Sequence, residues 1–340
     1  MKPLEIGNPF LIQLNLIKKC TLKCSYCYLK KVNDLHLSLK GVENFLLKFS
    51  EWTSKYKFFL HLNLTGGDLW MHSEIEKICN FVYSQKFISK ISLLINDLNY
   101  KKAKEIILGL KDKIDVVQVN LALMSERKED LAFLAENDIK SVVKLMLSKS
   151  VDISNQIKIA NSLKEAHPGL LISIDRFCPL NRSDYKNVLS LDSFLRVIRK
   201  IKLIFGSSFI TDDPVIKTIS YLEAKSNKRA RNLDLVGLNC ISGCIVPNGG
   251  FAVYPDGDIK LCSRMSGFNT GFNVDNFDLL EYLKKFYYIQ EIRKNNCGKC
   301  KLFNLCLGGC IATSYAKNNL INKDAHCLEN LSHERKNTLR

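Results

Sequence analysis

The sequence lacks a long hydrophobic run. No segment approaches the ~20 consecutive apolar residues that a membrane-spanning helix needs. The first twenty residues have no charged stretch leading into an apolar run and no small-residue cleavage site. Gln13 and Asn15 interrupt the only apolar stretch there. We therefore expect no signal peptide, no membrane partner and a cytoplasmic protein.

Blocks of like charge, fixed-period repeats and low-complexity segments are also missing. No block of five or more like charges occurs, although the formal net charge is +16. A basic surface attracts polyanions such as nucleic acid or acidic peptides. Dispersed lysines are equally typical of an ordinary solvated surface. Both interpretations stay open, and we predict no nucleic-acid partner.

Cysteine, by contrast, is abundant. The 340 residues include 13 cysteines, which is an odd number. Reducing thiols in the cytoplasm keep most disulfides from forming. Metal ligation is therefore the first role to test for these side chains.

Apolar and amphipathic segments alternate through the first half of the chain. With 340 residues and 46% apolar side chains, the composition predicts one large domain and a smaller one. Short runs rich in Ile, Leu and Val predict strands at Phe10–Leu16, Phe58–Leu64, Lys90–Asn96, Val116–Leu121, Val142–Leu147 and Leu170–Asp175. Amphipathic stretches predict helices at Leu39–Thr53, Ser73–Tyr83, Tyr100–Leu110, Arg127–Glu136 and Ile153–Lys164. Ser73 is predicted to cap its helix, with Glu76 completing a reciprocal capping pair.

This alternation predicts an α/β fold with a parallel sheet and covering helices. Six strands in residues 1–186 would form three quarters of a TIM-like barrel, a partial (β/α)6 barrel, with its site at the carboxyl ends of the strands. Residues 187–236 are predicted to connect two domains, with a helix at Leu191–Phe205 and a basic segment at Lys225–Arg231. Residues 237–340 contain eight of the 13 cysteines and predict a small cysteine-rich domain.

Three cysteines directly follow the first predicted strand. Cys20, Cys24 and Cys27 stand at spacings of four and three. They could hold one corner of a four-iron cluster and leave the fourth iron open, whereas such clusters usually take four thiolates. A structural zinc site is the alternative, but it requires four ligands in paired spacings, and no His lies in this loop.

This loop, with Tyr26 before its last cysteine, resembles the signature of the radical S-adenosylmethionine (SAM) superfamily. The second predicted strand ends in Gly66-Gly67-Asp68, which resembles the superfamily's Gly-Gly-Glu motif with Asp in place of Glu. The resemblance implies that the three cysteines hold the catalytic cluster and that the motif binds the SAM amino group. Glycines let a backbone approach a ligand closely, and a carboxylate suits an ammonium group.

Two asparagines match the superfamily more weakly. Asn96 stands at the end of the third predicted strand, and Asn120 at the end of the fourth, where the superfamily contacts the SAM ribose. A polar residue that caps a strand explains each position equally well. The resemblance implies cofactor binding by Tyr26, Gly66, Gly67, Asp68, Asn96 and Asn120.

The C-terminal cysteines are numerous enough for two further clusters, since eight thiols can ligate two fully. The run from Cys297 to Cys327 and the segment from Gly257 to Cys262 resemble a SPASM domain. The resemblance implies a nearer auxiliary cluster on Cys240, Cys244, Cys262 and Cys310, and an outer one on Cys297, Cys300, Cys306 and Cys327. Three 4Fe-4S clusters result, and one or two zinc sites are the alternative. We expect Cys79 and Cys178 to be small buried core residues, and the alternative for Cys178, which follows the sixth predicted strand, is that it faces the cavity.

The resemblance implies an oxidoreductase that reductively cleaves SAM to a 5′-deoxyadenosyl radical and abstracts a hydrogen from a peptide or protein. It favours a maturase of ribosomally made peptides that installs an oxidative cross-link or a related modification. The alternative within this superfamily is an anaerobic sulfatase-maturating enzyme, which forms formylglycine. That branch typically has Asp after the cysteine matching Cys262, where this sequence has Ser263. An iron–sulfur regulatory or RNA-binding protein is an alternative of another class.

The implied partners are a ribosomally made precursor peptide and a flavodoxin- or ferredoxin-type electron donor. Only nineteen residues precede Cys20. Leader recognition is therefore expected to use the barrel, the SPASM domain or a separate leader-binding protein.

Overall fold

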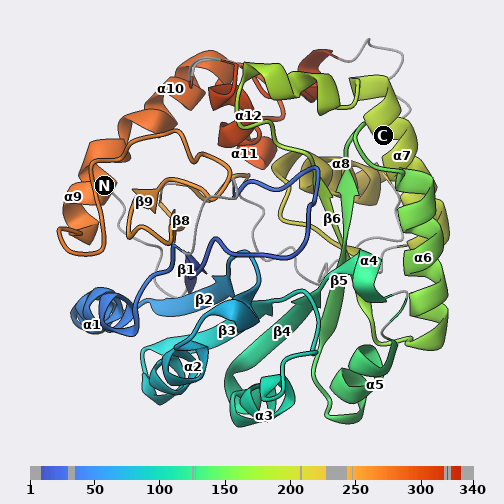
Figure 1. Cartoon of the computed structure of the whole chain (residues 1–340). Coiled ribbons are helices and arrows are strands. Elements are labelled where there is room, and N and C mark those ends of the chain that lie inside the picture. Colours follow the sequence, from blue (N-terminus) through green and yellow to red (C-terminus); the bar gives the residue numbers. More distant parts are fainter. Residues whose placement is uncertain are drawn as a thin grey trace. The chain divides into compact units, whose positions relative to one another are not determined.

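The structure is a computed structural model that describes residues 9–29, 35–124, 126, 128–206, 209–226, 243–246, 248–317, 320 and 323–330 (Figure 1). The chain divides into two compact units. Unit 1 comprises residues 1–144, 158–171 and 246–285, and unit 2 comprises residues 145–157, 172–245 and 286–340. The predicted domain boundaries at residues 186 and 237 stay a prediction.

Unit 1 is built on a parallel sheet. Its strands are β1 (Pro9–Asn15), β2 (Phe59–Thr65), β3 (Ile88–Leu94), β4 (Ile114–Val119) and the first part of β5 (Ser141–Leu147). β1 pairs with β2, β2 with β3, β3 with β4 and β4 with β5, always in parallel. All their carboxyl ends therefore meet at one edge, where a parallel barrel carries its site.

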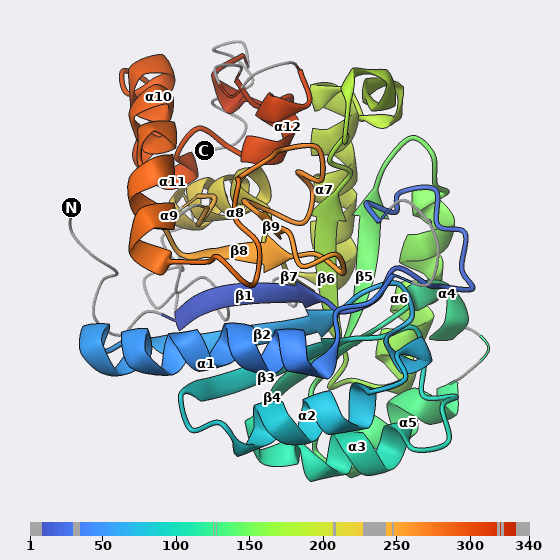
Figure 2. The same cartoon turned by 60° about the vertical axis from the view of Figure 1, so that its left-hand side comes forward.

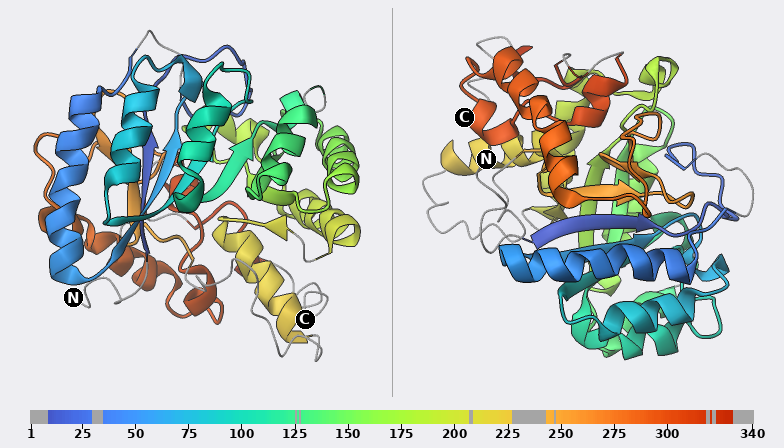
Figure 3. Two further views of the ribbon diagram at one scale, coloured as in Figure 1. Left: turned by 90° about the horizontal axis from the view of Figure 1, so that it is seen from below. Right: turned by 90° about the vertical axis from the view of Figure 1, so that its left-hand side faces the viewer.

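Helices follow the strands of unit 1 in alternation. They are α1 (Leu39–Tyr56), α2 (Ile75–Ser84), α3 (Ala103–Gly109), α4 (Leu121–Met124), α5 (Lys128–Glu136) and the greater part of α6 (Ile153–Ala166). α1, α2 and α3 lie side by side along the strands (Figure 3). Every predicted strand and helix of this region lies within three residues of the observed one at each end.

The predicted start of α2 is wrong. Glu74, not Ser73, occupies the N-cap position, and it makes no side-chain capping bond. The Glu74 carboxylate instead accepts a hydrogen bond from the backbone N–H of Leu39 at 3.0 Å. Glu76 forms an ion pair with Lys102 at 2.7 Å. Tertiary partners have thus taken the carboxylate of Glu76, which the predicted reciprocal cap would have used, and that of Glu74.

Two further strands extend the sheet beyond β1. β8 (Gly250–Val253) runs parallel to β1, and β9 (Ile259–Lys260) pairs with β8 in antiparallel fashion (Figure 2). Gly250 is required there, because a Cβ at this position would lie 2.2 Å from the carbonyl oxygen of Leu11. The strand order in unit 1 is therefore β5-β4-β3-β2-β1-β8-β9.

An aromatic core holds β1, α1 and β8 together. The Phe251 ring contacts the rings of Phe10 and Phe45 with centroids 5.5 and 6.1 Å apart. Phe277 completes the group at 4.9 Å from Phe251. Side chains that are distant in the sequence are thereby buried as one core, and each such ring buries 150–250 Å².

Unit 2 contains β6 (Leu171–Arg176, from its second residue), which pairs in parallel with β7 (Phe209–Ile210). Its longest helices are α7 (Leu191–Phe205) and α8 (Pro214–Ser226), followed by α10 (Tyr288–Cys297), α11 (Phe303–Cys306) and α12 (Ile311–Tyr315). α7 has the predicted bounds, begins at a Ser190 cap and ends at Gly206 with φ +61°. α8 was not predicted.

The predicted fold class is confirmed: the protein is α/β, with a parallel sheet that resembles a partial TIM barrel and a cysteine-rich C-terminal part. Among the described residues, no helix is both long and apolar enough to cross a membrane.

Candidate metal centres

The first cysteine loop leaves β1 at the carboxyl edge of the sheet. Cys20 and Cys24 are half-buried and Cys27 is exposed. A tight turn joins two of them, because the Cys27 N–H donates to the Cys24 carbonyl at 3.2 Å. The three thiols therefore belong to one short loop that solvent, and hence an incoming cofactor, can reach.

The Gly66-Gly67 pair lies against the segment that leads into this loop. The Gly67 N–H donates to the Ile17 carbonyl, and the Asp68 N–H donates to the Lys19 carbonyl, each at 2.7 Å. A Cβ at Gly67 would stand 2.2 Å from the Lys19 oxygen, and one at Gly66 would stand 2.6 Å from the Ile17 oxygen. The two glycines are thus required for the close approach of two backbones, which sets the end of β2 beside the cysteine loop.

Asp68, Asn96 and Cys20 form a short chain of contacts. Asp68 accepts the Trp70 N–H at 3.2 Å and is hydrogen-bonded to the side chain of Asn96. The Asn96 amide nitrogen lies 3.7 Å from the Cys20 sulfur. Burial raises the pKa of the Asp68 carboxyl, and the hydrogen bonds from Trp70 and Asn96 oppose that shift. Carboxylate, amide and thiol thus meet at the carboxyl ends of β1, β2 and β3.

Asn120 lies next to this group through its backbone. Its N–H donates to the Asn96 carbonyl at 3.1 Å. Its side-chain oxygen accepts the Ala122 N–H at 3.0 Å and so caps the turn at the start of α4. The structure therefore brings Asn120 to the site and also gives its side chain a capping role.

The two tyrosines of the loop have different surroundings. Tyr26 is half-buried and hydrogen-bonded to Cys24, and burial foremost raises its pKa. Tyr28 accepts a hydrogen bond from Gln13 and donates one to Asn15, each at 2.7 Å. The Asn15 amide in turn donates to the Val253 carbonyl at 2.9 Å.

Sequence reasoning missed this anchor. The signal was present, because Gln13 and Asn15 are polar residues on alternating positions of an otherwise apolar strand. Asn15 is fully buried, so its polar atoms need partners inside the protein. Tyr28 meets that need and ties the cysteine loop to β1 and, through Asn15, to β8.

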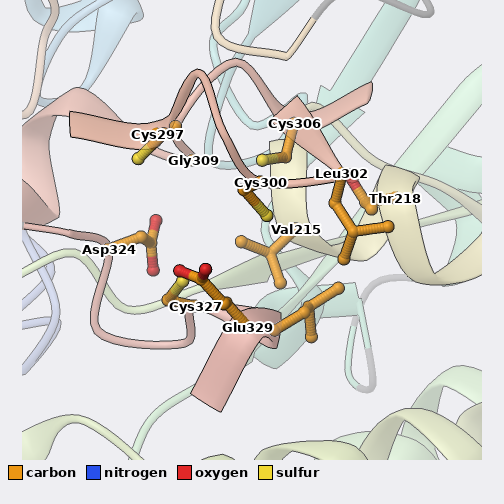
Figure 4. Close-up of a pocket in the computed structure, with 12 residues that line it drawn as sticks. Val215, Thr218, Cys297, Cys300, Leu302, Cys306, Gly309, Asp324, Cys327 and Glu329 are labelled. Carbon is orange, nitrogen blue, oxygen red and sulfur yellow. The ribbon is translucent and has the colours of Figure 1, made fainter. Parts of the chain in front are cut away.

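Four C-terminal cysteines line one cavity in unit 2. The cavity measures about 440 Å³, its open mouth included, and Figure 4 shows the thiols around it. They are Cys297, Cys300, Cys306 and Cys327, which is the set that the SPASM resemblance implies for the outer cluster. Burial, the largest cause, raises the pKa of Cys297, Cys306 and Cys327. Neighbouring thiolates raise the pKa of Cys297 and Cys306 further, and the carboxylates of Glu329 and Asp324 do so for Cys327. The raised pKa favours the protonated thiols, and a bound metal would favour the thiolate forms that ligate it.

The turn after α11 shapes one side of this cavity. Leu307, Gly308 and Gly309 all have positive φ, at +46°, +83° and +80°. A Cβ at Gly309 would lie 2.5 Å from the Asp324 side chain. The left-handed turn therefore leads the chain from Cys306 directly to Cys310.

The set implied for the nearer cluster is divided between the two units. Cys240 lies outside the described residues. In unit 1, half-buried Cys262 follows β9, and its sulfur lies 3.5 Å from the Arg264 nitrogen. In unit 2, Cys244 follows Gly243, whose Cβ position would lie 2.0 Å from the Cys306 oxygen. Cys310 is buried in the same unit.

The two remaining cysteines are both buried, as predicted, but in different surroundings. Cys79 lies on α2, and burial raises its pKa to about 12. The Cys178 sulfur lies 3.7 Å from the Cys310 sulfur and 3.8 Å from the Arg176 carbonyl oxygen. Cys178 therefore adjoins a candidate ligand.

A buried ionic cluster lies beside Cys310, and we call it the Arg176 network. Its members are Arg176, Asp213, Asp324 and His326, all at most 4% exposed. Arg176 donates to Asp213 at 2.5 Å, to both carboxylate oxygens of Asp324, and to His326 Nδ1 at 2.9 Å. Burial opposes the charged form of Arg176, but the two carboxylates outweigh it and raise its pKa.

Throughout the described ranges, no three His, Cys, Asp or Glu side chains converge on a position for one metal ion. A structural zinc site takes four ligands around one ion. A four-iron cluster is wider than one ion and draws its four thiolates from around a cavity rather than toward one point.

Two groups of solved structures have a similar fold over most of this chain. SuiB of Streptococcus suis, bound to its precursor peptide SuiA, has a TM-score of 0.71 at 17% identity, covering 94% of this chain and 76% of SuiB. The enzyme anSMEcpe, with bound AdoMet and the Cp18Cys peptide, has a TM-score of 0.67 at 13% identity, covering 97% of this chain and 95% of that one.

At these identities the likeness shows the fold alone, and this fold is the one that the resemblance implied. SuiB has also been solved bound to S-adenosylmethionine, at a TM-score of 0.68 and 18% identity to this chain. No family model matches the sequence. No curated protein matches it either.

Proposed function

We propose that this protein is a radical SAM enzyme that modifies a peptide, with a precursor peptide as substrate and an oxidative cross-link or related modification as product. The observation that carries the proposal is the meeting of Cys20, Asp68 and Asn96 at the carboxyl edge of the sheet. These three side chains come from three different segments. A thiol suits an iron–sulfur cluster, and a carboxylate suits the ammonium group of SAM.

The residues at this edge fit a cluster with one open iron. Cys20, Cys24 and Cys27 offer three thiols from a single accessible loop. Asp68 offers a partly buried carboxylate, which suits the SAM ammonium group. When bound, the cluster and SAM would supply a 5′-deoxyadenosyl radical that abstracts a hydrogen atom from the substrate.

The cavity in unit 2 fits a second, fully ligated cluster. Four thiols line it, and four thiolates are the usual ligand set of an iron–sulfur cluster. We propose that these four hold the outer auxiliary cluster, and that Cys244, Cys262 and Cys310, together with Cys240, hold the nearer one. A flavodoxin- or ferredoxin-type protein would supply the electron for SAM cleavage.

The other residues of the site position these groups and keep them fixed. Gly66 and Gly67 hold the end of β2 against the segment that leads into the cysteine loop, which keeps Asp68 beside that loop. Tyr28 anchors the far end of the loop on buried Asn15. A radical reaction demands such fixed geometry, because a displacement of about 1 Å costs about a hundredfold in rate.

A peptide is the proposed substrate class because SuiB and anSMEcpe, which share the fold, were each solved with a peptide bound. Ser263 favours a precursor peptide over a sulfatase-type substrate, because the sulfatase branch typically has Asp there. The Ser263 carbonyl accepts a hydrogen bond from the Tyr254 hydroxyl at 2.5 Å, and Ser263 is buried. Ser263 therefore lies in the packed interior of unit 1.

The experiment is a pair of parallel incubations of the anaerobically reconstituted, reduced protein with SAM. One contains the precursor peptide encoded beside the gene, and the other contains a sulfatase-derived Cys peptide. We expect 5′-deoxyadenosine and a precursor peptide lighter by two hydrogens, with the Cys peptide unchanged. Conversion of the Cys peptide to formylglycine, with the precursor untouched, would overturn the maturase assignment. Absence of any SAM cleavage would overturn the enzyme assignment itself.

A further inference from the structure

Two backbone segments that carry candidate cluster ligands meet at one buried carboxylate. The Asp324 carboxylate accepts the backbone N–H of Cys310 at 2.7 Å and that of His326 at 2.8 Å. The Cys327 N–H donates to the Asp324 carbonyl at 3.1 Å. One residue thereby holds the backbone at Cys310, from the nearer set, and at Cys327, from the outer set.

Arg176 fixes this carboxylate from behind. The guanidinium is bidentate to Asp324, which is the geometry that orients a carboxylate most strictly. It stands at the carboxyl end of β6, two residues before Cys178, whose sulfur lies 3.7 Å from that of Cys310. Through Asp324, Arg176 therefore attaches both ligand segments to the end of β6 and not to a loop.

Asp213 is the second carboxylate partner of Arg176, and its hydrogen bonds to backbone N–H groups lie on α8 and not on a ligand segment. One of its oxygens accepts from the guanidinium at 2.5 Å. The other caps α8 by accepting the Val215 and Ile216 N–H groups at 2.9 and 3.1 Å. Asp213 thus contributes charge to the Arg176 network, whereas Asp324 contributes both charge and hydrogen bonds.

The Arg176 network carries a net charge of −1. Arg176 is +1, and the two carboxylates are −2 together. His326 adds no charge, because its Nδ1 faces the guanidinium at 2.9 Å. A guanidinium can only donate, so Nδ1 must accept, and the ring is neutral with Nε2–H donated to the Leu189 carbonyl.

We infer that the Arg176 network is a positioning and tuning device for the auxiliary clusters. Asp324 positions the ligand backbones, and the net negative charge lowers the reduction potential of the cluster that Cys310 holds. The inference rests on the proposed function, since it requires that these cysteines bind clusters. A fixed negative charge in a low-dielectric interior disfavours the addition of an electron nearby, and net charge is one of the terms that set cluster potentials.

The test separates position from charge with two kinds of variant. Asp213→Asn and Asp213→Ser remove the charge, and both retain an oxygen that can cap α8, since Asn and Ser cap as well as Asp. Arg176 then keeps Asp324 as a partner, so the network becomes neutral rather than unpaired. Asp324→Ala removes the acceptor of the Cys310 N–H. Asp130→Asn is the matched control, because Asp130 is also buried and also accepts a backbone N–H, from Leu98 at 2.9 Å in unit 1.

Each reconstituted full-length variant is assayed for iron and sulfide and titrated electrochemically with EPR detection. We expect both Asp213 variants to keep the wild-type iron content and to show an auxiliary-cluster potential shifted to more positive values. Asp324→Ala should lose auxiliary iron, and Asp130→Asn should change neither the iron content nor any potential.

Two results would overturn the inference while leaving the proposed function intact. One is an unchanged auxiliary potential in iron-replete Asp213 variants, and the other is a loss of iron from both of them. An Asp324→Ala variant with full iron would refute the positioning role. Wild-type protein that binds no iron would overturn the proposed function and this inference together.

Discussion

Gly67 offers a sharp test of how the cysteine loop is held. A methyl group at this position would stand 2.2 Å from the Lys19 carbonyl oxygen and 2.7 Å from that of Lys18. Both are backbone atoms, and the Lys19 oxygen already accepts the Asp68 N–H. The clash therefore cannot be relieved by rotating a side chain, so the two backbones must separate in Gly67→Ala.

The cost follows from the contacts that this separation breaks. Overpacking of a fitted interior costs about 1–3 kcal/mol. The hydrogen bonds of Gly67 and Asp68 to the Ile17 and Lys19 carbonyls contribute about 0.5–1.5 kcal/mol each. The sum, about 2–6 kcal/mol, falls on the segment that leads directly into Cys20. We therefore expect Gly67→Ala to lose about four irons of roughly twelve per chain, and all SAM cleavage, while the auxiliary clusters remain.

The measurement is iron and sulfide content, with 5′-deoxyadenosine formation under dithionite as the second readout. Gly109→Ala is the matched control, because nothing lies within 4 Å of a Cβ placed there. Gly109 ends α3, and Ala in a helix is favoured over Gly by about 0.5–1 kcal/mol. If Gly67→Ala held the same iron and cleaved SAM as fast as Gly109→Ala, the reasoning about this backbone approach would be refuted.

Four other predictions follow from the same structure. Replacement of Cys20, Cys24 and Cys27 by Ala should remove about four irons and all SAM cleavage; stoichiometric zinc with little iron in the native protein would contradict this. Asp68→Ala should weaken SAM binding by roughly 1.5–3 kcal/mol with full iron content, and equilibrium dialysis checks it. Cys297→Ser should lower the iron content, whereas Cys79→Ser, at a buried position of α2, should leave it unchanged. Burial and then Arg176 lower the pKa of His326 from 6.5 to about 4, so stability is complete above pH 6.5 and is lost as the pH falls toward 4. From pH 7 to 5 this loss is about 2 kcal/mol; urea unfolding should show it, and His326→Gln should abolish that part of the slope.

Local pattern determined most of the elements in this protein. The strands β1 to β6 and the helices between them alternate as the apolar periodicity predicts, because period and burial are recorded in each short segment. The grouping of the C-terminal cysteines came from the SPASM resemblance, because the two implied ligand sets interleave along the chain. Four of them, Cys297, Cys300, Cys306 and Cys327, indeed line one cavity.

Only the tertiary structure decided the contacts that depend on distant partners. The pairing of β8 with β1 joins residues about 240 positions apart, and no local pattern encodes such a partner. The Gly66-Gly67 motif was attributed to ligand binding, yet its Cβ positions are blocked by the Ile17 and Lys19 backbone. The sequence did not predict the Arg176 network for the same reason. Its charges stand far apart in the sequence, and burial is stable only because folding brings them within hydrogen-bonding distance of one another.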